Sequence, residues 1–141
     1  MFKSILTIPL FAALALAQGA QIGYPPQGTS VAPGSSLTVQ VERPSTLTPS
    51  EEVAVAIGIQ SCATDACTSP TEGMGQILYN GAFAPAYHEP GTPPYQNFTV
   101  QIPSTLADGT ALIGVTHVAL VGAVYYPLFQ VLNRTITIST A

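Results

Sequence analysis

The sequence has 141 residues, which is room for one domain rather than two. Charged residues make up 7%, hydrophobic residues 47%, and the formal net charge is −4. So few basic residues cannot neutralise phosphates, which excludes nucleic-acid binding, and the apolar content excludes a disordered chain. Thirteen prolines and twelve glycines favour short strands joined by turns over a helical bundle.

Residues 1–17 have the features of a secretory signal peptide. A positive residue precedes an apolar run that ends in Ala15-Leu16-Ala17, which places small residues where signal peptidase reads them. We predict cleavage before Gln18, with a cut before Gln21 as the alternative. Because the apolar run is too short to span a bilayer, we expect a secreted domain of residues 18–141 without a membrane span. That domain holds two arginines against seven acids.

Alternation of apolar and polar residues, together with one β-rich segment of unclear phase at residues 110–121, predicts six or seven strands. The predicted strands cover residues 37–42, 53–60, 76–79, 97–102, 110–121 and 129–138. In the second strand Val53, Val55, Ile57 and Ile59 share one face. The opposite face carries mostly small residues, so we expect another segment to pack closely over it. Asn80-Gly81 predicts a tight turn.

No stretch has helical periodicity, and the chain contains no internal repeat. The strand number and length fit a single immunoglobulin-like or fibronectin-like β-sandwich of about seven strands. The chain contains no tryptophan, so the core tryptophan of antibody domains is absent. The predicted fold class is therefore all-β, without the antibody core pattern.

The two cysteines, Cys62 and Cys67, enclose four residues. In a secreted chain with only two cysteines, an intramolecular bridge is the default. So short a loop should contribute about 2 kcal/mol of stability. The spacing does not match a redox pair, and two thiols alone do not hold a metal ion.

Asn97-Phe98-Thr99 and Asn133-Arg134-Thr135 match the acceptor pattern for N-glycosylation. In each predicted strand the asparagine lies on the polar face. We therefore expect Asn97 and Asn133 to point to solvent and to carry glycans.

The titratable residues form no catalytic or metal-binding motif. His117 lies inside a predicted strand and is expected to be a hydrogen-bonded core or face residue. Glu51 and Glu52 are sequence neighbours in a turn and are expected on a solvated edge. No nucleophile elbow, free thiol or cofactor loop occurs, so we predict no enzyme activity, no metal and no cofactor.

A proline-rich loop is the best candidate for binding. Tyr87, His88, Glu89 and Tyr95 lie in or beside it, and its prolines restrict the backbone and lower the ordering cost of binding. Tyrosines on such loops contact proteins or stack on sugars, but they also serve as internal anchors. A second aromatic cluster is Tyr125-Tyr126-Pro127.

Several short sequence segments, taken in chain order, resemble the fungal necrosis-inducing secreted protein family, in particular its mushroom-type members. They include Gln21-Ile22-Gly23, the run from Pro33 to Val41, the run from Val55 to Cys62, Gly75 to Gly81, Tyr95 to Val100 and His117 to Ala123. The resemblance implies a secreted effector with an immunoglobulin-like fold that promotes or modulates plant cell death. It also implies a host or extracellular protein partner, with plant receptor-like kinases as the candidate. A module that binds cell-wall polysaccharide is the alternative.

Overall fold

A computed structural model describes residues 19–140, so the predicted signal peptide and its cleavage site before Gln18 lie outside the described residues. The described chain contains eight strands and no helix, which confirms the all-β prediction. The strands are β1 (Gln21–Tyr24), β2 (Thr29–Val31), β3 (Ser36–Glu42), β4 (Ser50–Ser61), β5 (Gln76–Gly81), β6 (Tyr95–Gln101), β7 (Gly109–Val121) and β8 (Tyr126–Ile138). The sequence pattern missed β1 and β2, because four and three residues are too few to show alternation.

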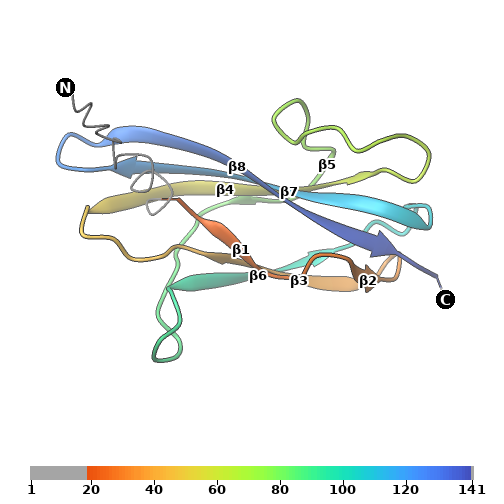
Figure 1. Cartoon of the computed structure of the whole chain (residues 1–141), viewed down its shortest axis with the longest axis horizontal. Coiled ribbons are helices and arrows are strands. Elements are labelled where there is room, and N and C mark those ends of the chain that lie inside the picture. Colours follow the sequence, from red (N-terminus) through yellow and green to blue (C-terminus); the bar gives the residue numbers. More distant parts are fainter. Residues whose placement is uncertain (1–18, 141) are drawn as a thin grey trace, which may run out of the picture.

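The strands form two layers (Figure 1). A three-stranded sheet has the order β1-β3-β6, and a five-stranded sheet has the order β2-β8-β7-β4-β5. All pairings are antiparallel except that of β2 with β8. β1 contacts β8 along one side of the layers, and β5 contacts β6 along the other.

Alternate residues of β3, β4, β6, β7 and β8 meet between the sheets in one hydrophobic core. Its fully buried members include Val39, Val41, Val55, Ile57, Ile113, Val115, Ile136 and Ile138. Burial of one such side chain contributes about 1.5–3 kcal/mol. The sequence therefore identified the strands that supply the core, although for β7 it left open which residues face inward.

The small residues on the outer face of β4 are covered, as the sequence predicted. Gly58 pairs with Gly114 of β7, and the segment after β4 crosses over both. A Cβ at Gly58 would lie 2.4 Å from the carbonyl oxygen of Met74, and one at Gly114 would lie 3.0 Å from Pro70 Cβ. The bridge between Cys62 and Cys67 closes the start of this segment, which confirms the predicted disulfide.

Two local predictions are wrong. Asn80-Gly81 forms no tight turn but belongs to β5, where Gly81 pairs with Val55. A hairpin cannot form there, because the next strand, β6, belongs to the other sheet. Val53 is 49% exposed rather than buried, because the β4–β7 ladder slips between Glu52 and Ala54. Because of this β-bulge, Val53 has no partner on β7. The residues before Val53 then point to the opposite face of the sheet from the one that strict alternation predicts.

Candidate functional site

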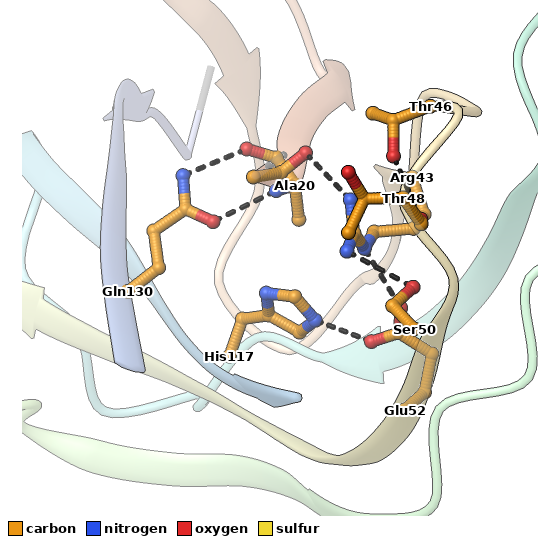
Figure 2. A network of polar contacts seen from close by, with 9 residues as sticks. Ala20, Arg43, Thr46, Thr48, Ser50, Glu52, His117 and Gln130 are labelled. Carbon is orange, nitrogen blue, oxygen red and sulfur yellow. Dashed lines mark hydrogen bonds and ion pairs between the residues drawn. The ribbon is translucent and has the colours of Figure 1, made fainter. Parts of the chain in front are cut away.

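A network of charged side chains lies between the two sheets where β3 ends and β4 begins (Figure 2). Arg43, directly after β3, is 6% exposed, and its Nε donates to Glu52 Oε1 at 2.7 Å. The second Glu52 oxygen lies 2.5 Å from Nε2 of His117, a fully buried residue of β7. Arg43 Nη2 also donates to Ser50 Oγ at 3.2 Å. Glu52 thus joins a guanidinium and an imidazole inside the fold.

The prediction that Glu52 lies on a solvated edge is wrong, whereas the prediction of a hydrogen-bonded core position for His117 is confirmed. The bulge at Val53 explains the error, since it turns Glu52 inward while Glu51 stays exposed. Burial alone would raise the pKa of Glu52. The hydrogen bonds and charges of His117 and Arg43 outweigh that effect and hold the pKa of Glu52 below its ordinary value.

Gly19 and Ala20, the first residues that the structure describes, form hydrogen bonds to Arg43 of this network and to Gln130 of β8 (Figure 2). The backbone N–H of Ala20 donates to Gln130 Oε1 at 2.7 Å, and Gln130 Nε2 donates to the carbonyl of Ala20 at 3.0 Å. The carbonyl of Gly19 accepts from Arg43 at 3.5 Å. Ala20 is 5% exposed and belongs to the hydrophobic core. Gly19 and Ala20 are therefore part of the folded structure.

Two adjoining depressions open at this end of the molecule, with volumes of about 620 Å³ and about 550 Å³. We call them together the end groove, with residues 44–52 on one wall and residues 83–94 on the other. Its lining includes six prolines: Pro44, Pro49, Pro85, Pro90, Pro93 and Pro94. Arg43 and Glu52 line the larger depression, so the buried network supports the groove from below. Fixed proline backbones and a paired charge network hold its shape.

The structure places three of the four predicted loop residues along the smaller depression. Tyr87 is 69% exposed, and its hydroxyl forms a solvent-exposed hydrogen bond with Ser45 Oγ on the opposite wall. The ring of His88 stacks on that of Tyr95 with centroids 4.0 Å apart. Glu89 Oε1 accepts a hydrogen bond from the Tyr95 hydroxyl at 2.8 Å.

Tyr95 differs from the expectation that it makes contacts to a partner, because it is only 7% exposed. Its hydroxyl bonds to Glu89, and this hydrogen bond raises the pKa of Tyr95. The backbone of Tyr95 also exchanges hydrogen bonds with Ala86. Tyr95 therefore positions the loop from beneath, and Tyr87 and His88 are the aromatic residues that the loop exposes.

The other predicted site residues lie elsewhere. Asn97 and Asn133 are both exposed, on β6 and β8. Tyr125 and Tyr126, 55% and 43% exposed, lie at the β7–β8 hairpin. Within residues 19–140 no group of three His, Cys, Asp or Glu residues is arranged to hold a metal ion. No helix in this part of the chain could cross a membrane.

Comparison with known proteins shows to which family the chain is related. The model of the Nis1 family, fungal necrosis-inducing secreted protein 1, matches residues 15–137. The chain belongs to the Nis1 family. No curated protein sequence matches it significantly. The Nis1 family is a secreted effector family, and the Cys62–Cys67 bridge is consistent with an extracellular location.

Proposed function

We propose that this Nis1-family protein is a secreted, non-enzymatic, effector-like binding protein that recognises its partner with the end groove. Family membership supports the effector class. The observation that carries the site is the groove itself, with proline walls and an exposed Tyr87 above a buried ion-pair network. Rigid walls favour binding because little conformational entropy is lost on association.

The strand order supports an immunoglobulin-like arrangement of the proposed domain, residues 18–141. The orders β1-β3-β6 and β8-β7-β4 correspond to ABE in one immunoglobulin sheet and to GFC in the other. In such sandwiches the loops at the ends of the sheets carry recognition, and the end groove is built from two of these loops.

The charges indicate the chemistry of the partner. Among the described residues, Arg43 is buried, and Arg134 is half-buried and donates to the carbonyl of Ile22 at 2.5 Å. The exposed charged residues of this part of the chain are all acids: Glu51, Asp65, Glu72, Glu89 and Asp108. Two of them, Glu51 and Glu89, line the groove. We therefore propose a host or extracellular protein with a neutral or basic contact surface, with the plant receptor-like kinase as the candidate class.

Cell-wall polysaccharide is the second candidate. The exposed rings of Tyr87, Tyr125 and Tyr126 favour it, since sugar rings stack on aromatic faces.

The test is a binding screen of the secreted protein against receptor-kinase ectodomains and kinase domains, with chitin, β-glucan and cellulose in parallel. Tyr87→Ala should weaken the interaction at least about tenfold, because it removes the exposed ring from the groove. The free energy of unfolding should change by about 0.5 kcal/mol or less. Tyr24→Ala, which removes a half-exposed ring of β1, is the control and should bind normally. Normal binding by Tyr87→Ala would refute the groove assignment, and binding of polysaccharide alone would favour the second candidate.

The N-terminus of the secreted protein is a separate prediction. A cut before Gln21 would remove Gly19 and Ala20, and with them the bonds to Arg43 and Gln130. We therefore expect the signal peptide to end at Ala17 and the mature chain to begin at Gln18. Intact mass and N-terminal sequencing of protein from the medium check this. A chain beginning at Gln21 with unchanged thermal stability would contradict it.

A further inference from the structure

Both predicted glycosylation sites lie on strands with an open edge. β6 is the outer strand of the three-stranded sheet, and Asn97 lies on it. β8 carries Asn133, and only its last three residues, Ile136–Ile138, pair with β2. Before Ile136, one side of β8 pairs with no strand among the described residues; β1 of the other sheet contacts β8 but forms no ladder with it. Open strand edges promote pairing with other chains.

On β6, the backbone groups of Tyr95 face the sheet edge and are covered there by Ala86. Asn97 is the next residue whose backbone groups face this edge. The backbone N–H and C=O of Tyr95 face away from β3, because both bond to Ala86. Backbone groups two residues apart point in the same direction, so those of Asn97 and Thr99 also face the open edge. Their ladder partners among residues 19–140 are on β3, on the other side.

On β8 the same relation holds. The N–H of Thr135 donates to Gln27 Oε1, and its carbonyl accepts from the N–H of Gly28. Thr135 therefore faces the edge and is covered there. Asn133 is the next edge-facing residue, and it begins the part of the edge without a strand partner in residues 19–140.

The usual protection of a strand edge is weak on these two strands. Proteins guard edges with charged side chains, prolines, bulges or very short strands. Residues 97–101 of β6 contain no charged residue and no proline, and on β8 the only such residues before Ile136 are Pro127 and Arg134, which leaves residues 128–133 without either. By contrast, β1 and β2 are short, with four and three residues, β1 has a bulge after Ile22, and the β4–β5 ladder has one after Ile57. The two least guarded edges are the ones that carry an acceptor asparagine.

We propose that N-glycans at Asn97 and Asn133 act as edge guards that prevent edge-to-edge pairing with a second copy of this chain. Both side chains are exposed, so a glycan fits without disturbing the core. A branched sugar beside the first open position excludes an incoming strand by bulk. The proposal requires passage through the secretory pathway but is independent of which partner the end groove binds.

The test compares proteins secreted from a eukaryotic host that adds N-glycans. Mass spectrometry should find glycans on both asparagines, and light scattering after size exclusion should find a monomer. Thr99→Ala with Thr135→Ala abolishes both acceptor sites and should shift the protein to dimers or larger species at the same concentration. Thr99→Ser with Thr135→Ser preserves both sites and should stay glycosylated and monomeric.

A second set of variants separates edge protection from general solubility. Asn97→Gln with Asn133→Gln should self-associate, whereas Asn97→Lys with Asn133→Lys should stay monomeric, because lysine is itself an edge guard. Adding Ala66→Lys, at an exposed loop position, to the glutamine variant should not restore the monomer. If a variant fails to fold, trimming the glycans from the folded wild-type protein gives the same comparison. Absence of glycans, or a glycan-free protein that stays monomeric, would overturn the proposal.

Discussion

Replacement of Glu52 by alanine is expected to lower the free energy of unfolding by about 3 kcal/mol. The carboxylate accepts hydrogen bonds from Arg43 and His117 between the two sheets. Its removal leaves the guanidinium of Arg43 buried without its anion, and such an unpaired charge is strongly destabilising. Denaturant unfolding followed by circular dichroism measures the effect. Glu51→Ala changes an exposed neighbour and should alter stability by about 0.5 kcal/mol or less.

The same carboxylate predicts sensitivity to acid. The pKa of Glu52 lies below its ordinary value of 4.5 in the folded protein. Its ionised form therefore contributes stability that is fully present above the ordinary pKa and is lost as the pH falls through the folded pKa. Glu52→Gln keeps the shape but lacks the charge, so its stability should fall less steeply than that of the wild type as the pH falls below about 4.5. Glu51→Gln should retain the wild-type profile, and identical profiles for all three proteins would contradict an ionised Glu52 in the network.

The strands with regular alternation could be predicted from the sequence, and the reason is local. In β3, and in β6 from Asn97 on, every second residue faces the core, so apolar residues recur with period two. The disulfide could also be predicted, since only Cys62 and Cys67 are available to pair. The order of the strands, and which strand pairs with which, depend on contacts between residues far apart in the sequence. The local pattern at Asn80-Gly81 therefore resembled a turn, although the chain after β5 crosses to the other sheet.

The charge network could not be predicted, because it depends on one irregularity. Without the bulge at Val53, Glu52 and Val55 would lie on opposite faces of β4 and Glu52 would point to solvent. Nothing in the local sequence marks that bulge. Arg43 also comes directly after a regular strand, where a charged residue normally ends on the surface. Only the tertiary structure brings Arg43, Glu52 and His117 together.

The candidate loop was found from its composition, but the roles within it were not. Tyr87 and Tyr95 are the same residue type at the two ends of one proline-rich segment. The difference is that Tyr95 begins β6 and is covered by the loop, where His88 stacks on its ring, whereas Tyr87 lies between strands and is exposed. Burial therefore divides the pair into an anchor and a surface residue.

This division gives the second large prediction. Tyr95→Ala should lower the free energy of unfolding by about 3 kcal/mol, since it empties a buried aromatic site. It also removes the ring on which His88 stacks and the donor that holds Glu89. Residues 83–94 should therefore become more accessible, and limited proteolysis should cut there faster than in the wild type.

Two matched variants separate the anchor from its hydrogen bond. Tyr95→Phe keeps the ring under His88 but loses the bond to Glu89, so it should lower stability by only about 1 kcal/mol. Tyr87→Ala removes an exposed ring and should leave both stability and the rate of loop cleavage close to wild type. Equal losses of stability in Tyr95→Ala and Tyr87→Ala would show that Tyr95 does not support the wall of the groove. The expected order, with a large loss for Tyr95→Ala and a small one for Tyr95→Phe, places the support in the buried ring.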